Sequence, residues 1–491
     1  MEFPIFLWLI IIPLVASPLI YLSGHLGSRR IAQWTSLAVL LVTWIPFGFA
    51  AAELQNTDFL SYTYGGISLR FDGLSLLLSA VALGLGTMVV IFSGPYMSKE
   101  ANQEKFYAML IAMVGVMIGL GCAHDLFNLW IWFEAMAITS YLLVAFYREL
   151  PLSLEAGVKY LLQSAAGSVL VLLGISLVLA QTGTLDLTEI RQAESSPWLL
   201  AAGATFLIGF GVKTALVPLH TWLPDAHSMA PSGISAMLSG VVIEAGLIAM
   251  LRSLGALADV TAWWGPFLMI FGVLNMMIGN LMALRQKQVK RLLAYSSLTH
   301  VGYMLVGLGV ALYLGVFNGA QGGAFHLFNH GVMKGLAFLA AGSLLYTLHI
   351  ASGDHHPLLI SDLNGASKRY PLVALTFSLA VLGLGGIPPL SGFMSKWQIF
   401  ISGFESHDIW IELLVLFAAI NSVFSLAYYA PMINALYRLE PSETVVKGNR
   451  MPGTMKIPLV VLAILVIVIG LWPGLMNWLT IPAGTALVNM F

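Results

Sequence analysis

Long apolar segments recur along the whole chain, separated by short polar stretches. A helix needs about 20 mostly apolar residues to cross the hydrocarbon core of a membrane. By this criterion the pattern predicts about fourteen membrane-spanning helices. Their approximate limits are 4–22, 31–52, 73–94, 106–122, 125–147, 156–181, 198–217, 231–254, 263–284, 292–314, 320–348, 371–403, 410–437 and 456–478.

One polar and aromatic segment, residues 53–72, separates the second span from the third. Its composition predicts a short hairpin outside the membrane. Asp72 stands directly before the third helix, where a carboxylate can accept a hydrogen bond from the first helical turn. No polar stretch of the chain is long enough to form a separate soluble domain.

Two of the predicted spans are interrupted near their middles. Pro218 interrupts GFGVKTALVPLHTWLP, and Pro388 and Pro389 interrupt GLGGIPPLSGFMSKW. Proline removes a backbone donor and clashes with the preceding helical turn. Within a membrane such a break is tolerated only where protein or a water-filled cavity satisfies the freed carbonyl groups. Two broken helices in corresponding places are typical of transporters built from repeats.

The composition agrees with a protein that is solvated by lipid. Of 491 residues, 58% are hydrophobic and only 9% are charged, against about 25% charged residues in soluble domains. The formal net charge of −1 gives no indication of a nucleic-acid partner. A single cysteine, Cys122, excludes an internal disulfide, a CxxC motif and a cysteine-ligated iron–sulfur cluster. The apolar N-terminal segment has no basic residues before it, so we interpret it as the first span and not a cleaved signal.

The basic residues between the spans are distributed asymmetrically. Loops after odd-numbered spans carry most of them, whereas loops after even-numbered spans carry only Arg70, Arg191 and Arg252. Basic loops face the cytoplasm. We therefore predict a multi-pass protein of a bacterial or archaeal cytoplasmic membrane, with both termini outside.

Five charged residues fall well inside the predicted spans: Glu134, Lys213, Glu244, Lys334 and Lys396. Each charge at mid-membrane costs roughly 2.5–3.5 kcal/mol on insertion scales, so the set costs on the order of 10–15 kcal/mol. The functional interpretation is a proton relay, because burial brings lysine and glutamate closer to exchanging protons at neutral pH. The alternative is a set of buried ion pairs that tie helices together, which seldom stabilise more than apolar side chains would.

Histidines accompany one of these lysines. His326 and His330 precede Lys334 by two turns and one turn, which places all three on one face of a helix. Imidazole takes and gives protons near neutral pH, which favours a relay. Satisfied core histidines, or a metal bound by the pair, are the alternatives, although no HExxH motif is present. His300 is a weaker relay candidate.

A polar segment follows the first break. His220, Asp225 and His227 lie in LHTWLPDAH, where the broken helix nears the cytoplasmic side. This segment is either a structural loop or an entrance for protons, and His300 is a further candidate for such an entrance. An intramembrane enzyme is a third class of function, but HExxH and GxSxG are both missing and the carboxylates lie on separate helices.

Four segments together resemble one known family. VKTALVPLHTWLPDAH, VKRLLAYSSLTHVGYM, FHLFNHGVMKGLAFLAAG and GGIPPLSGFMSKW are similar to the antiporter-like subunits shared by respiratory complex I, Mrp-type Na+/H+ antiporters and membrane-bound hydrogenases. The resemblance covers nearly the whole chain. It implies an all-α fold of fourteen helices, with two inverted five-helix repeats and discontinuous seventh and twelfth helices.

The resemblance also implies roles for individual residues. Glu134 matches the family's fifth-helix glutamate, Lys213 its seventh-helix lysine, Lys334 its eleventh-helix lysine and Lys396 its twelfth-helix lysine. In the family, these residues form a hydrated polar axis. Glu244 departs from the pattern, because most members have lysine there. We expect Glu244 to be neutral, or to pair with Lys213 or Lys334.

The predicted organisation has four parts: helices 1–3 with an external polar loop (1–105), two five-helix repeats (106–254 and 263–437), and helix 14 (438–491). We expect a proton-translocating subunit of a redox-driven membrane complex, of the NADH:quinone oxidoreductase or hydrogenase kind. The alternative is the D-type subunit of an Mrp Na+/H+ antiporter. The expected partners are other membrane subunits, lipid, and H+ or Na+. No cofactor, metal or redox centre is expected in this chain, so whether it counts as an enzyme is left open.

Overall fold

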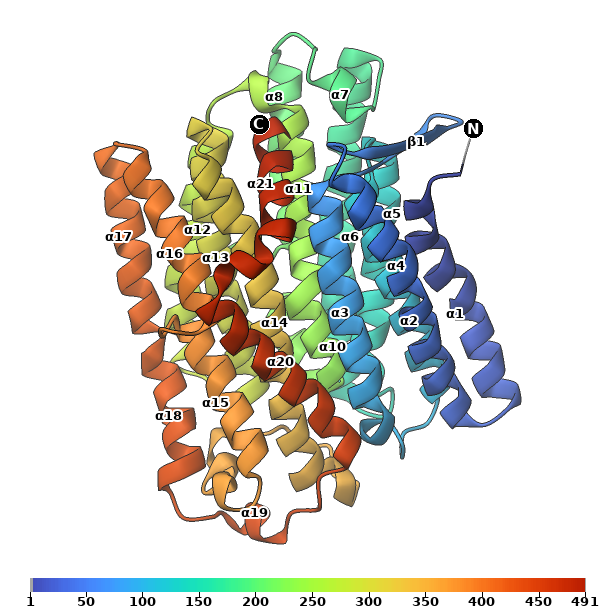
Figure 1. The fold of residues 1–491 in the computed structure, drawn as a ribbon, viewed down its shortest axis with the longest axis vertical. Helices are drawn as coiled ribbons and strands as arrows, with labels where there is room; N and C mark the ends of the chain where they lie inside the picture. The colour runs from blue at the N-terminus through green and yellow to red at the C-terminus, as the bar shows by residue number, and fades with distance from the viewer. Residues whose placement is uncertain (1–2, 491) are drawn as a thin grey trace.

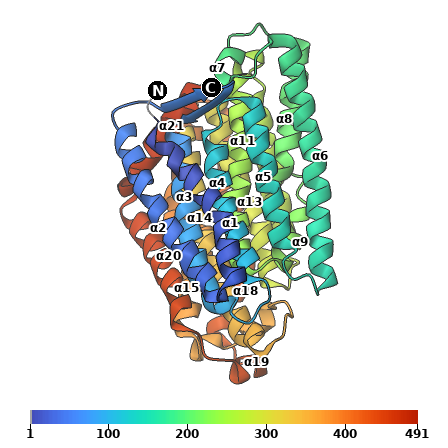
Figure 2. The ribbon, with the colours of Figure 1, turned by 90° about the vertical axis from the view of Figure 1, so that its right-hand side faces the viewer.

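The computed structural model describes residues 3–490, with all of their side chains except that of Arg29. Most of the helices run side by side along the long axis of one bundle (Figures 1 and 2). The continuous long helices are α1 (Trp8–Leu26), α2 (Arg29–Leu54), α3 (Gly73–Tyr96), α4 (Gln103–Cys122), α5 (Leu126–Val144), α6 (Pro151–Thr182), α12 (Trp264–Ala283), α13 (Val289–Leu314), α14 (Phe317–Leu348) and α20 (Gly453–Leu471).

Other predicted spans consist of shorter helices in series. The eighth comprises α10 (Ser232–Met237), a π-helical turn (Leu238–Val242) and α11 (Ile243–Ala256). The thirteenth comprises α17 (Ile409–Phe424) and α18 (Leu426–Arg438). In the described part of the chain, 12 helices are long and apolar enough to cross a membrane, and the shorter apolar helices Pro197–Lys213 and Pro371–Gly385 occupy the seventh and twelfth positions. The predicted all-α polytopic fold is confirmed.

The two breaks lie where the prolines predicted them. The seventh span divides into α8 (Pro197–Lys213) and α9 (Trp222–Met229), and Pro218 lies between them. The twelfth divides into α15 (Pro371–Gly385) and α16 (Ser391–Glu405), with Pro388 and Pro389 between them. The discontinuous helices are therefore features of the structure.

The polar segment after the second span forms the predicted hairpin. Strands β1 (Leu60–Tyr64) and β2 (Ile67–Phe71) pair antiparallel, and Leu60 faces Phe71. The Asp72 carboxylate then accepts a hydrogen bond from the Ser75 amide at 3.0 Å, which caps α3 as its position predicted.

Burial differs strongly across the bundle. The span Ser232–Ala256 is wholly buried, and α3, α4, α13 and α14 are mostly buried. In contrast α1, α2, α6 and α17 expose many apolar side chains, among them Leu19, Trp34 and Leu162. A surface this apolar is compatible with lipid and not with water. Charged residues on the inner helices are consequently far from solvent.

The bundle has two distinct ends. The N- and C-terminal ends of the chain, the β hairpin and the short helix α7 (Leu187–Ile190) lie at one end, which we call the terminal face (Figure 1). The short helix α19 (Glu443–Lys447) and the foot of α18 lie at the other end, the opposite face (Figure 1). The C-terminal helix α21 (Asn477–Met490) follows α20 towards the terminal face.

Candidate functional site: a polar axis through the bundle

The first break is stabilised by a side chain from a neighbouring helix. Asn275 on α12 accepts a hydrogen bond from the Val217 amide at 2.8 Å and donates one to the Ala215 carbonyl at 3.3 Å. Breaking a helix in a low-dielectric environment frees backbone groups that need partners. The neutral Asn275 amide provides them, so the lysine at the end of α8 is not needed for this purpose.

Lys213, the last residue of α8, is fully buried. Its Nζ lies 4.3 Å from the centroid of the Tyr160 ring, which stacks on Trp222 at 4.0 Å. Among the described residues, the Lys213 ammonium has no hydrogen-bond partner and no carboxylate within 4 Å. An aromatic face stabilises a cation without taking its protons. Lys213 is thus held in place but retains all of its donors.

Glu134 lies on α5, which packs against α8 through an edge-to-face contact of Phe133 and Phe210 at 5.0 Å. Its Oε1 is buried and has no hydrogen-bond partner in the described part of the chain. Buried polar atoms are normally paired with protein or with ordered water. Glu134 Oε1 and Lys213 Nζ are therefore two buried polar groups on neighbouring helices, each without a hydrogen-bond partner among the described residues.

Glu244 on α11 bonds to a histidine and not to a lysine. Its Oε1 lies 2.8 Å from Nδ1 of His330, and both side chains are fully buried. The two helices approach closely here, since a Cβ added to Gly331 would lie 2.9 Å from the Gly240 carbonyl oxygen. No ion pair of Glu244 with Lys213 or Lys334, one of the alternatives that the sequence suggested, is present among the described side chains.

Three histidines form a cluster beside Glu244. His300 Nδ1 lies 3.0 Å from His326 Nε2, and His326 Nδ1 lies 2.9 Å from Ser395 Oγ. The rings of His300 and His330 are 5.3 Å apart, and His330 Nε2 has no partner in the described structure. A row of hydrogen bonds thus runs from Ser395 through two histidines, and one gap separates it from the Glu244–His330 pair.

The other two buried lysines are firmly bonded. Lys334 donates to the Leu293 carbonyl at 2.8 Å and to Ser296 Oγ at 2.5 Å. Lys396 donates to the Leu384 carbonyl at 2.7 Å and to Ser422 Oγ at 2.8 Å, and its Nζ lies 4.5 Å from the centroid of the Tyr303 ring. Within residues 3–490, no group of three or more histidine, cysteine or acidic side chains is arranged to hold a metal ion.

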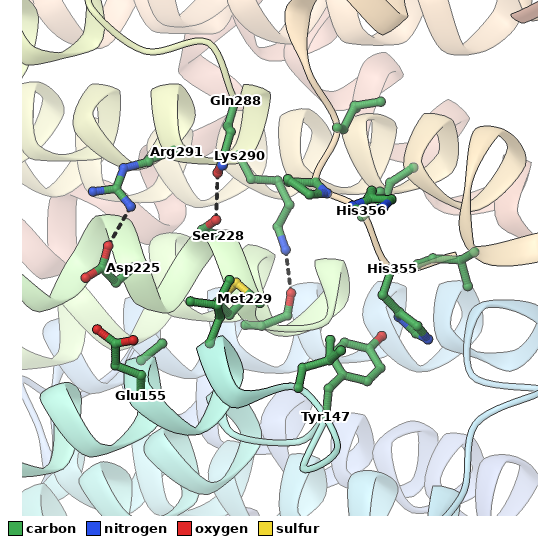
Figure 3. A pocket seen from close by; sticks show the side chains of 18 of the residues that line it. Tyr147, Glu155, Asp225, Ser228, Met229, Gln288, Lys290, Arg291, His355 and His356 are labelled. Carbon is green, nitrogen blue, oxygen red and sulfur yellow. Dashed lines mark hydrogen bonds and ion pairs between the residues drawn. The ribbon is translucent and has the colours of Figure 1, made fainter. Parts of the chain in front are cut away.

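A cavity of about 560 Å³ opens at the opposite face, and we call it the opposite-face cavity (Figure 3). Charged and polar side chains from α6, α9, α13 and the 353–358 segment line it. Asp225 in its wall accepts from Arg291 at 2.5 Å and from Lys159 at 3.1 Å. Lys290 donates to the Ala230 carbonyl, as Figure 3 also shows.

The histidines after the first break occupy different depths. His227 is buried, between Asp225 and Ser228 of the cavity wall in the sequence, and its ring stacks on Phe338 at 4.7 Å. Both of its ring nitrogens are without partners among the described residues. Phe338 follows Lys334 by one turn of α14, so His227 connects the cavity to the helix that carries the cluster. His220 is only partly buried, near Tyr295. His300 lies deeper, in the histidine cluster.

The structure brings Glu244, the three histidines of the cluster and Lys396 together, with Tyr303 between Lys396 and the cluster. Glu134, Lys213 and His220 lie near the first break, and His227 lies near the opposite-face cavity. Sequence reasoning missed the side chains that hold these residues in place: Tyr160, Asn275, Ser296, Tyr303, Ser395 and Ser422. These are neutral residues in apolar spans, and no local pattern distinguishes them from ordinary packing residues.

Fold and site together define a class of protein: a polytopic membrane protein with a buried, charged axis, as found in ion carriers. Comparison with known proteins identifies the family within this class. Residues 123–425 match the family described as NADH:quinone oxidoreductase/Mrp antiporter, transmembrane region. Residues 65–107 match the N-terminal region of chain 5 of NADH-ubiquinone oxidoreductase (complex I). The chain belongs to this family of antiporter-like membrane subunits.

Individual relatives cover nearly the full length. The F420H2 dehydrogenase subunit N of Methanosarcina mazei is 32% identical over 470 residues, which are 93% of this chain and 92% of that subunit. A chain of the archaeal membrane-bound sulfane sulfur reductase, a respiratory membrane complex, superposes with a TM-score of 0.89 at 29% identity and covers 99% of this chain and 98% of its own length. The Mrp complex of Dietzia sp. DQ12-45-1b contains the same fold, with a TM-score of 0.87 at 21% identity, covering 99% of this chain and 97% of that one.

Proposed function

We propose that this chain is the proton-translocating, antiporter-like subunit of a redox-driven, complex I-like complex in a prokaryotic cytoplasmic membrane. The observation that carries the proposal is the buried row of Lys213, the Glu244–His330 pair, the histidine cluster and Lys396. Buried ionisable residues in a membrane protein mark ion paths, because their insertion is costly. Relatives over nearly the full length belong to complexes that transfer electrons, by their names.

In this proposal protons enter from the opposite face. That face carries most of the basic loops, which makes it cytoplasmic, so that both termini face outward. Asp225 and Ser228 line the opposite-face cavity on either side of His227 in the sequence, and the two His227 ring nitrogens, unpaired among the described residues, can accept and pass on a proton. Lys334 and His330 lie next along α14, and His330 bonds to Glu244 of α11.

Movement of charge along the row follows from electrostatics. Unit charges 4 Å apart interact by about 4 kcal/mol at an effective dielectric constant of 20. A change of partner at Glu134 or Lys213 therefore alters the protonation of its neighbours. At this step, where the family resemblance predicts a lysine, Glu244 instead forms an attractive contact with His330.

The test uses the intact complex in proteoliposomes containing a pH-sensitive dye. It is driven by NADH with a quinone, then by the reduced deazaflavin cofactor F420, and separately by an imposed Na+ gradient. We expect donor-dependent proton movement that Lys213→Ala and Glu244→Gln abolish and Lys447→Ala, on exposed α19, leaves intact. Proton movement driven by the Na+ gradient alone would instead identify a subunit of a secondary antiporter. An undiminished signal in Lys213→Ala would make the row structural and refute the proposed mechanism.

A further inference from the structure

A second cavity, of about 580 Å³, opens at the terminal face, between the β hairpin, α7, α11 and α21. We call it the terminal-face cavity. Arg70, Arg191 and Arg252 all line it. These are the only basic residues that the sequence placed in loops after even-numbered spans, and they come from three distant parts of the chain. The tendency of basic loops to face the cytoplasm does not explain why these arginines converge on one cavity, because it disfavours basic residues at the terminal face.

A buried ion pair forms part of the wall of this cavity. Arg252 donates to both carboxylate oxygens of Asp72, at 2.8 and 3.0 Å, and also to Ser75 Oγ at 3.1 Å and the Gly121 carbonyl at 2.6 Å. The side chains of Arg252 and Asp72 are only 1% and 5% exposed. Burial by itself would raise the pKa of Asp72, but the charge and hydrogen bonds of Arg252 hold this pKa below its ordinary value. Arg252 thus favours the ionised form of Asp72.

A row of polar side chains leads from this pair towards the buried axis. Asp72, Ser75 and Ser79 follow one another at helical spacing on α3, and Ser75 Oγ lies 3.0 Å from an Asp72 oxygen. The hydroxyl of Ser79 is buried and has no partner among the described residues, and the same holds for Glu244 Oε2. Unpaired buried polar atoms are the usual partners of internal water.

Helix packing brings α3, the helix that carries Ser79, close to Glu244 Oε2. A Cβ added to Gly331 would lie 2.7 Å from Val81 of α3 and 3.8 Å from Glu244 Oε2. Arg252 follows Glu244 by eight residues on α11, a distance of about 12 Å along the helix axis. The stretch between the ion pair and the axis is therefore short, and α3 supplies its hydroxyl groups.

We propose that Asp72 and Arg252 close an outlet for protons from Glu244 to the terminal-face cavity. The inference rests on the proposed function, since it assumes that Glu244 carries transported protons. Protonated Glu244 loses its proton to water beside Ser79. The proton passes along Ser75 to the Asp72 carboxylate, which becomes neutral and releases Arg252. Asp72 then gives the proton to water in the cavity and binds Arg252 again.

The first test measures passive proton conductance of the reconstituted complex without an electron donor. Arg252→Gln removes the cation that keeps Asp72 ionised, and we expect conductance to rise at least about tenfold, equivalent to a barrier lower by about 1.4 kcal/mol. Adding Asp72→Asn or Glu244→Gln should restore the basal value, because each removes one proton carrier. Arg438→Gln, an exposed residue near the opposite face, is the matched control. Basal conductance in an assembled Arg252→Gln complex would overturn the outlet.

The second test measures whether water reaches the segment between Asp72 and Glu244. Cys122 is the only cysteine of the chain, so Cys122→Ala provides a background for Ser79→Cys. A membrane-impermeant thiol reagent, added from the terminal face, should label Ser79→Cys faster when Arg252→Gln is also present. Ser343→Cys is the control, because the Ser343 hydroxyl is bonded to the Leu339 carbonyl. No labelling of Ser79→Cys in either background would show that water does not reach this position, and it would overturn the outlet.

The two proposals fail in distinguishable ways, because neither test of the outlet needs an electron donor. A leak in Arg252→Gln, together with no donor-driven proton movement in the unmodified complex, would overturn the proposed function and retain the outlet as a proton path. Donor-driven movement without a leak or labelling would overturn the outlet alone.

Discussion

The two broken helices differ in what satisfies their freed backbone groups. At the first break a neutral amide, Asn275, bonds to Val217 and Ala215, and Lys213 has no hydrogen-bond partner in the described structure. At the second break the lysine itself bonds to the Leu384 carbonyl and to Ser422. Both ammonium groups lie over a tyrosine ring, at 4.3 and 4.5 Å. The same residue type is thus free to exchange partners at one break and part of the helix architecture at the other.

The largest difference between the breaks is expected in transport. Lys213→Ala should reduce donor-driven proton movement to about a tenth or less, since a tenfold loss needs only about 1.4 kcal/mol. It should change stability little, because Lys213 Nζ has no hydrogen bond to lose among the described residues. Proton movement in proteoliposomes and thermal unfolding in detergent measure the two effects. A variant that loses stability but transports normally would reverse the assignment.

Asn275→Leu is expected to damage the first break structurally. It leaves the Val217 amide and the Ala215 carbonyl without their partner, at a cost of about 1–3 kcal/mol for each buried group. A thermal unfolding midpoint clearly below that of the unmodified complex is the expected result. Met277→Leu, on an exposed part of the same helix, is the control and should unfold normally. Equal midpoints would mean that Asn275 is not needed at the break.

Lys396→Met tests the second break. It removes the bonds to Leu384 and Ser422, but Ser422 keeps its bond to the Gly385 carbonyl at 3.2 Å. We expect a loss of stability of about 1–2 kcal/mol, accompanied by a smaller loss of transport than in Lys213→Ala. Lys396→Arg, which can donate to the same acceptors, should recover much of the stability. If Lys396→Met stops transport without changing stability, the two lysines have the same role.

The last expected effect is a pH dependence of stability that arises from His124, between α4 and α5. Burial, with the charges of Arg252 and Arg70, lowers the pKa of His124 to about 4. Between this value and its ordinary pKa near 6.5, unfolded His124 binds more protons than folded His124. Stability should therefore fall as the pH falls from about 6.5 to 4.

Unfolding midpoints across this pH range measure the effect of His124. His124→Gln should flatten the dependence, whereas His356→Gln should not, because that side chain is 82% exposed. A slope that is unchanged in His124→Gln would assign the effect to other groups.

Much of the fold could be predicted from the sequence. Apolar runs located the spans, prolines located both breaks, and the position of Asp72 identified a helix cap. These features depend on local composition or on the chemistry of one residue. The charged members of the axis were also predictable, because a charge inside an apolar span is conspicuous. The division into two inverted five-helix repeats stays a prediction.

The partners of the buried charged side chains were harder to predict from the sequence. Glu244 was expected to be neutral or to pair with a lysine, and it bonds to His330. Arg252 was interpreted as a loop residue, and it is buried against Asp72, 180 residues earlier in the chain. Such pairs depend on which helix faces lie together, and a sequence without alternating polarity on its buried helices does not specify those faces.

The sequence by itself determined that the chain lies in a membrane, where its helices break, and which charges the membrane must accommodate. Hydrophobicity and proline geometry act locally, so they can be read one segment at a time. Only the tertiary structure decided which charge meets which partner, which lysine is free and where the two cavities open. Those outcomes depend on close packing between distant helices, as where Gly240 meets Gly331 beside Glu244.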